Sequence, residues 1–279
     1  GEMGELAADE DIAKLRALGY VGDSVGQEVG SAGSDGHLSV PVNRYNQALL
    51  YRFDGQLDRA LEKLVELQEF APEFAPGYYG EAVLLIETGD LEAAVARVER
   101  AVELSPDFIA AWAELGESRF RLNELADAER AFERAHAIEP NHPRVNLRLG
   151  QIRASQRRFS EASGLLARAE ASLRNPGEAA LAAVQLGVLA EQDRQFDKAE
   201  ELYQRALRRV PGYPYALERY GNLLLFQKRL DEALRAYELL TRSAPEAPRT
   251  WQLYARALEI AGRMEDARSA RERTESLAP

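Results

Sequence analysis

Prolines recur at a fixed spacing along most of this chain. Pro72, Pro106 and Pro140 follow one another at intervals of 34 residues, and Pro211, Pro245 and Pro279 do the same. Twelve residues before each proline stands an alanine, and twelve before that a second small residue, Ala or Gly. A fixed period of this length indicates a repeat architecture, in which each unit packs mainly on its neighbours.

Each period has the features of a helical hairpin. Apolar residues such as Leu57, Leu61 and Leu64 recur at the three- and four-residue spacing that places them on one helix face. Gly55 and Gly89 stand midway between two such segments, where the left-handed backbone that ends a helix suits glycine. The proline after the second segment prevents that helix from continuing. The sequence therefore predicts an all-α fold of stacked helical hairpins.

The pattern resembles the tetratricopeptide repeat family over residues 41–279. The third unit carries the resemblance most plainly, with Trp112, Leu115, Gly116, Ala128, Phe132, Ala135 and Pro140 at the family's spacing and Arg119 in place of an aromatic residue. The resemblance implies a right-handed superhelical solenoid of about seven helix-turn-helix repeats. We place these units at 41–74, 75–108, 109–142, 143–179, 180–213, 214–247 and 248–279. One interval is 37 residues, which we attribute to an insertion around Asn175-Pro176-Gly177.

Residues 1–40 differ from the repeats, and we predict a short helix followed by a Gly/Ser-rich linker. Asp9-Glu10-Asp11 would open the helix, because acidic residues favour a helix N-terminus. The run from Leu15 to Gly22 resembles a tail segment of bacterial sulfatase-like hydrolases of the alkaline phosphatase superfamily. This resemblance implies an accessory C-terminal region of such an enzyme, located outside the cytoplasm; a simple leader before a cytoplasmic protein is the alternative.

Composition excludes several classes of function. With 35 Lys and Arg against 46 Asp and Glu, the net charge is −11, which disfavours nucleic acid as a partner. The chain has no cysteine and no apolar stretch long enough to span a membrane. The three histidines, His37, His136 and His142, have no ligand spacing typical of a metal site. No nucleophile motif or phosphate-binding loop is present, so we predict no catalytic residue, no metal and no cofactor.

The family resemblance also predicts where a ligand would bind. In tetratricopeptide superhelices the first helix of each hairpin lines the concave groove, and residues four apart share a face. The matching positions here are the candidate peptide-binding residues Tyr45, Leu49, Arg52, Phe53, Tyr79, Val83, Ile86, Glu117, Phe120, Arg121, Leu147, Gln151, Asn222 and Arg256. Several of these side chains could instead pack against the neighbouring hairpin.

We therefore predict a protein-interaction scaffold that binds a peptide or a helix in the concave groove. The positions that clamp a terminal carboxylate in chaperone-binding relatives hold Tyr45, Leu49, Tyr79 and Val83, so that use is disfavoured. Two alternatives remain open: the accessory region of a sulfatase-like or phosphodiesterase-like hydrolase, and a self-association module that forms a homo-oligomer. The identity of the protein partner does not follow from the sequence.

Overall fold

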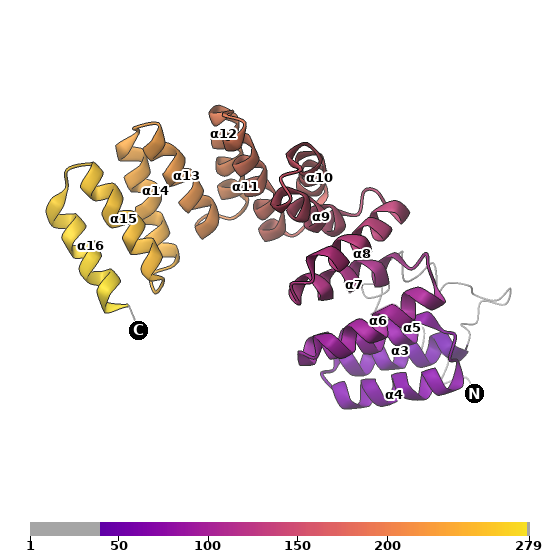
Figure 1. Ribbon diagram of the computed structural model, residues 1–279. Helices are drawn as coiled ribbons and strands as arrows, with labels where there is room; N and C mark the ends of the chain where they lie inside the picture. Colours follow the sequence, from indigo (N-terminus) through magenta and orange to yellow (C-terminus); the bar gives the residue numbers. More distant parts are fainter. Residues whose placement is uncertain (1–39, 278–279) are drawn as a thin grey trace. The chain divides into compact units, whose positions relative to one another are not determined.

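The computed structural model describes residues 40–277, and every regular element in this part of the chain is an α-helix. Figure 1 shows their arrangement along the chain. The helices are α3 (Val40–Phe53), α4 (Leu57–Phe70), α5 (Ala75–Thr88), α6 (Leu91–Leu104), α7 (Ile109–Arg121), α8 (Leu125–Ile138), α9 (Pro143–Ser155), α10 (Phe159–Ser172), α11 (Pro176–Gln192), α12 (Phe196–Arg209), α13 (Pro214–Phe226), α14 (Leu230–Ser243), α15 (Pro248–Ile260) and α16 (Met264–Ser276). The all-α prediction is confirmed. The short helix and linker predicted within residues 1–40 lie almost wholly outside the described residues.

Consecutive helices pack as antiparallel pairs, beginning with α3 and α4 and ending with α15 and α16. We call the first helix of each pair the A helix and the second the B helix. The chain forms two compact units: unit 1 ends at Pro140 and contains α3 to α8, and unit 2 begins at Asn141 and contains α9 to α16. Within each unit, every hairpin also packs on the next one, which is the stacking expected for an array of repeats.

Small residues allow the two helices of a hairpin to approach closely. A Cβ atom at Gly116 would lie 2.6 Å from the ring of Phe132, and one at Gly187 would lie 2.4 Å from the ring of Tyr203. Both aromatic rings are fully buried. Gly116, Gly187 and Gly221 each receive a large ring from their own B helix, which explains the small residue and the aromatic residue at fixed spacing in these hairpins.

The turn inside each hairpin needs one residue with a left-handed backbone. In unit 1 this residue is Gly55, Gly89 or Asn123, with φ of 73°, 91° and 63°. Three successive turns of unit 2 instead use Arg157, Arg194 and Lys228, with φ of 63°, 58° and 61°, before Gly262 closes the last hairpin. An L-residue with a Cβ atom is disfavoured in this conformation, by about 1–2 kcal/mol.

Several hairpins are tied to the loop before them by one hydrogen bond. The indole Nε1 of Trp112 donates to the carbonyl of Pro106, and that of Trp251 donates to the carbonyl of Pro245, both at 2.8 Å. In the second hairpin the hydroxyl of Tyr78 donates to the carbonyl of Pro72 at 3.1 Å. The aromatic residue and the proline of the repeat pattern are thus direct partners.

Two buried carboxylates join neighbouring hairpins. Glu81 on α5 lies 2.9 Å from Nε of Arg97 and accepts a hydrogen bond of 2.7 Å from Gln68 on α4. Glu170 on α10 binds both Arg205, at 3.2 Å, and Arg209, at 2.6 Å, on α12. A buried carboxylate is stable only when it is paired in this way.

The insertion around Asn175 adds to a helix. Pro176 and Gly177 form the first turn of α11, which has 17 residues where the other helices have 13 or 14. The side-chain oxygen of Asn175 accepts hydrogen bonds from the backbone N–H groups of Gly177 and Glu178, so it caps the new N-terminus.

Candidate functional site

Three of the predicted groove residues belong to the core. Tyr45, Leu49 and Leu147 are buried, and only 2% of Tyr45 is exposed. Gly80 on α5 makes room for the Tyr45 ring, because a Cβ atom there would lie 2.9 Å from it. Burial also raises the pKa of the Tyr45 hydroxyl well above its usual value. These three side chains have almost no surface for a ligand, so their assignment to the groove lining is corrected.

The remaining predicted residues of unit 1 keep part of their surface. Phe53 and Arg121 are exposed, whereas the others are half-buried, namely Arg52, Tyr79, Val83, Ile86, Glu117 and Phe120. On α5, Tyr79, Val83 and Ile86 are spaced by four and three residues and so share one face of the helix. The ring of Tyr79 packs on the buried ring of Phe108, with 5.1 Å between centroids.

An ion pair connects the first two A helices of unit 1. The guanidinium of Arg52, near the end of α3, donates to Oε1 of Glu87 on α5 through Nε at 2.9 Å and through Nη2 at 2.6 Å. This pair brings the end of α3, with the exposed ring of Phe53, beside the end of α5, which carries Ile86. We call this surface, formed by Arg52, Phe53, Tyr79, Val83, Ile86, Glu87 and Phe120, the A-helix face of unit 1.

Besides the buried Leu147, the predicted residues of unit 2 are the polar Gln151, Asn222 and Arg256, and the first two form hydrogen bonds. Gln151 accepts a hydrogen bond of 3.1 Å from Arg148. Asn222 accepts one of 2.9 Å from the hydroxyl of Tyr237, which is otherwise buried. Arg256 on α15 is exposed.

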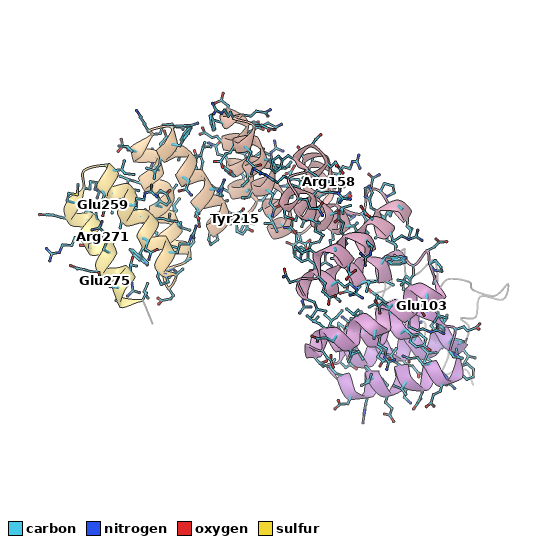
Figure 2. All side chains as sticks on the ribbon, in the orientation of Figure 1. Glu103, Arg158, Tyr215, Glu259, Arg271 and Glu275 are labelled. Carbon is cyan, nitrogen blue, oxygen red and sulfur yellow. The ribbon has the colours of Figure 1, made fainter. Side chains whose placement is uncertain are left out.

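Ion pairs also mark this polar side of unit 2. Glu218 binds Arg249 at 2.6 Å, and Glu259 binds Arg271 on the last helix (Figure 2). The A helices α13 and α15 therefore place ionic side chains at positions where α5 places apolar ones.

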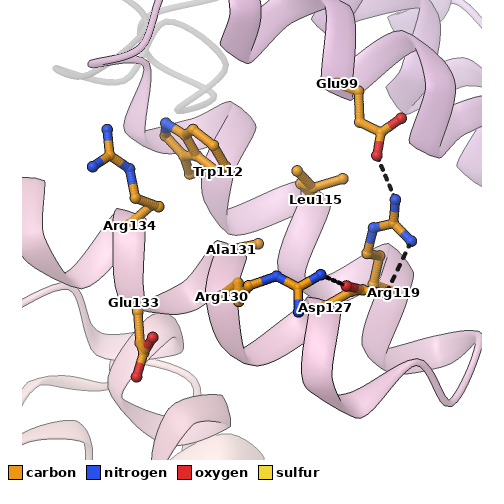
Figure 3. A pocket seen from close by; sticks show the side chains of 9 residues that line it. All are labelled: Glu99, Trp112, Leu115, Arg119, Asp127, Arg130, Ala131, Glu133 and Arg134. Atoms are coloured by element: carbon orange, nitrogen blue, oxygen red, sulfur yellow. Dashed lines mark hydrogen bonds and ion pairs between the residues drawn. The ribbon is translucent and has the colours of Figure 1, made fainter.

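A hollow that was not predicted from the sequence lies between α6, α7 and α8 and has a volume of about 520 Å³. Figure 3 shows the side chains that line it. Trp112, Leu115 and Ala131 supply its apolar part, and the guanidinium of Arg134 lies 5.6 Å from the centre of the Trp112 ring. Arg119 lines it too and is bound by Glu99 and Glu124. In the sequence, the only feature that could have indicated this hollow was Arg119, which stands where the family has an aromatic residue.

The described residues contain no group of three or more His, Asp or Glu side chains arranged to hold a metal ion. The structure gives His142 a local role, since its Nδ1 accepts a hydrogen bond of 3.3 Å from the N–H of Val145 at the start of α9. None of the helices between residues 40 and 277 is long and apolar enough to cross a membrane.

Solved structures with the same fold are numerous. PilF of Pseudomonas aeruginosa matches with a TM-score of 0.62 and 22% identity, over 70% of this chain and 88% of the other. A tetratricopeptide repeat protein of Parabacteroides merdae matches with a TM-score of 0.62 and 14% identity, over 86% and 93%. YrrB, a tetratricopeptide repeat protein with an unusual peptide-binding site, matches with a TM-score of 0.56 and 21% identity, over 65% and 92%. At these identities the likeness shows the fold alone.

Two family models match the sequence itself, and both describe the tetratricopeptide repeat. One matches residues 45–107 and 79–143, and the other matches residues 119–186 and 190–257, so together they span most of the chain. No curated protein matches it. Proteins of this kind generally mediate protein–protein interactions and are typically scaffolds without an active site. With the paired helices, the glycine–aromatic contacts and these matches in agreement, the chain belongs to the tetratricopeptide repeat family.

Proposed function

We propose that this protein binds a helical or extended segment of a partner protein on the A-helix face of unit 1. The observation that carries the proposal is the row of Tyr79, Val83 and Ile86 on α5, which stays partly open to solvent although the neighbouring hairpins are in place. An apolar row at this spacing fits the apolar stripe of an amphipathic helix, which has anchors at the same spacing.

The residues at the ends of the row indicate which side chains the partner segment needs. Phe53 extends the apolar surface at one side, and the Arg52–Glu87 pair lies beside it. A charged residue next to the apolar anchors of a bound segment can form an ion pair with Arg52 or with Glu87. Because both side chains remain partly open to solvent, such an ion pair adds little affinity, and the apolar contacts supply most of the binding free energy.

The test uses peptides selected from a random phage-displayed library against the full-length protein. We expect selected peptides to lose at least tenfold in affinity when Val83 is replaced by glutamate, because a charge would then occupy the centre of the apolar row. The control is Val65→Glu, which makes the same change at an exposed valine on the B helix α4 of the same unit. Fluorescence anisotropy measures the affinity and circular dichroism verifies the fold. Equal affinities for the two variants, or a library with no enriched binder, would refute the proposal.

The accessory role in a sulfatase-like hydrolase, with the location that it implies, remains a hypothesis. It depends on residues 15–22, which lie outside the described residues, and no feature of unit 1 or unit 2 supports it. The gene sequence upstream of the region that encodes this chain would test it directly, because the hypothesis requires a hydrolase domain there.

A further inference from the structure

Charge is distributed unevenly along the chain. Residues 40–140 contain ten basic and twenty acidic residues, a net charge of −10. Residues 141–279 contain 23 basic and 18 acidic residues, a net charge of +5. Residues 1–39 contain two basic and eight acidic residues, a net charge of −6. The N-terminal segment is thus repelled by the mean charge of unit 1 and attracted by that of unit 2.

The cations of unit 2 include several at one edge, where the A helices end and the B helices begin. We call it the turn edge of unit 2. Arg194 and Lys228 occupy the left-handed position of two successive turns there, and Lys198 lies in the first turn of α12; all three are exposed. Their neighbour Arg229 is instead held by Glu200 and Glu232, at 2.6 and 2.7 Å. Long cations in a conformation that favours glycine indicate a use for them beyond the fold.

The same edge exposes large apolar side chains. Phe226 is the last residue of α13 and is 68% exposed, while its ring packs on Phe196, the first residue of α12, with 5.1 Å between centroids. In the next hairpin, Ile260 ends α15 and Met264 begins α16, with 52% and 63% exposed. Exposed apolar side chains grouped on successive hairpins mark an interaction surface.

A hollow of about 360 Å³ adjoins these residues. Its apolar lining comes from Phe159, Leu186, Leu189 and Ala190, and its polar lining from Ser160, Ser163, Asp193, Gln195 and Lys198. It lies between the start of α10, the end of α11 and the start of α12, next to Arg194 and Phe196. The turn edge therefore offers a hollow of mixed polar and apolar lining, an aromatic pair whose Phe226 ring is exposed, and three cations, over three successive hairpins.

We propose that residues 9–21 of this chain bind to the turn edge of unit 2, from the same molecule or from a second copy. The segment begins with three acids, Asp9, Glu10 and Asp11, and continues with the apolar residues Ile12, Leu15, Leu18, Tyr20 and Val21. The acids complement Arg194, Lys198 and Lys228, and the leucines fit the depression beside Phe196. The basic residues Lys14 and Arg16 of the segment complement the acidic Asp193 on the rim of the hollow.

The absence of cysteine in the native sequence makes site-directed cross-linking selective. The variant pair Ala17→Cys with Gln195→Cys places one thiol in the segment and one on the rim of the hollow. The matched control is Ala17→Cys with Gln56→Cys. Gln56 precedes α4 in unit 1 as Gln195 precedes α12 in unit 2, and neither side chain caps its helix. With a short bismaleimide and the full-length protein, we expect the pair with residue 195 to react at least fivefold faster.

The products separate the two routes, since a cross-linked monomer shows binding within one molecule and a cross-linked dimer shows binding between two. Either product at that excess supports the proposal. Equal rates for the two pairs, or faster reaction with residue 56, would overturn it.

A charge reversal gives a second, independent readout. Lys198→Glu in the background of the Ala17→Cys and Gln195→Cys pair should lower the cross-linking rate at least threefold at low salt, and raising the ionic strength should reduce this difference. Lys63→Glu makes the same change on the B helix α4 of unit 1 and should leave the rate unchanged. A rate that responds equally to both substitutions would contradict binding at the turn edge.

Discussion

Units 1 and 2 are built from the same hairpin and differ in what they place on its surface. Both bury a B-helix aromatic ring against an A-helix glycine, as Phe132 does in unit 1 and Tyr203 in unit 2. Their turns differ, since unit 1 uses Gly55, Gly89 and Asn123 where unit 2 begins with three basic residues. The comparison teaches that this fold fixes the residues between helices and leaves turns and open faces to carry charge and binding.

The largest effect should come from emptying the shared core contact. Phe132→Ala in unit 1 and Tyr203→Ala in unit 2 should each reduce the free energy of unfolding by about 3–5 kcal/mol, because a buried ring is removed and its cavity remains. Trp112 lies in unit 1 and Trp251 in unit 2, so the single-tryptophan variants Trp251→Phe and Trp112→Phe report each unit separately.

In urea titrations, Phe132→Ala should shift the Trp112 transition more than the Trp251 transition, and Tyr203→Ala should do the reverse. Equal shifts at both tryptophans would show that the two units unfold as one cooperative body, and the comparison between them would then fail for stability.

A smaller effect should follow from neutralising the buried carboxylates. Glu170→Gln in unit 2 leaves Arg205 and Arg209 without their common partner and should cost about 1–3 kcal/mol. Glu81→Gln in unit 1 should cost less, because only Arg97 loses an ionic partner while Gln68 can still donate to the new amide. Thermal unfolding followed by circular dichroism compares the two. An equal or greater loss for Glu81→Gln would contradict this order.

The sequence predicts those features that are caused by residues within one repeat unit. The hairpins follow from prolines, glycines and apolar spacing within each unit, and the glycine–aromatic contacts follow from the same spacing. Exposure of the A-helix side chains depends on the next hairpin. Tyr45 is buried because residue 80 on the adjacent A helix is glycine, whereas Phe53 at the end of the same helix stays exposed.

The ion pairs could not be predicted from the sequence for a related reason. The ion pair between Arg52 and Glu87 joins residues 35 positions apart in the sequence. Unit 1 has many other acidic residues, and the sequence alone does not say which of them pairs with Arg52. Repeat spacing says which helices are neighbours but does not choose among rotamers of long side chains. The hollow beside Trp112 was missed for the same reason, since its walls include Arg119, Arg130 and Arg134.

An effect of about 1 kcal/mol should distinguish two buried tyrosines of unit 2. Tyr237 donates a hydrogen bond to Asn222, so Tyr237→Phe should cost about 0.5–1.5 kcal/mol. The hydroxyl of Tyr203 is buried beside Arg219 and Glu191 without a well-oriented hydrogen bond in the described part of the chain, so Tyr203→Phe should cost less than Tyr237→Phe. Urea denaturation observed at Trp251 measures both. A cost for Tyr203→Phe as large as that for Tyr237→Phe would show that the Tyr203 hydroxyl is hydrogen-bonded in solution.

The smallest effect should appear at the turns. Lys228→Gly should stabilise unit 2 by about 0.5–1 kcal/mol, because glycine adopts a positive φ without a Cβ penalty. The reciprocal change in unit 1, Gly89→Lys, should destabilise it by a similar amount. Differential scanning calorimetry resolves both changes in midpoint. If Lys228→Gly lowered the stability, the basic residues would serve the fold itself, and the contrast between the two sets of turns would lose its functional meaning.

The hydrogen bonds from Trp112 and Trp251 to proline carbonyls have a mechanical consequence. Each one closes a loop of seven residues at the joint between two hairpins, so a force applied to the ends must break it before the joint can lengthen. The joints before α11 and α13 have Ala183 and Leu217 at the equivalent position, and neither side chain can donate such a bond. Under tension, the joint before α15 should therefore resist lengthening through a contact that the other two joints of unit 2 do not have.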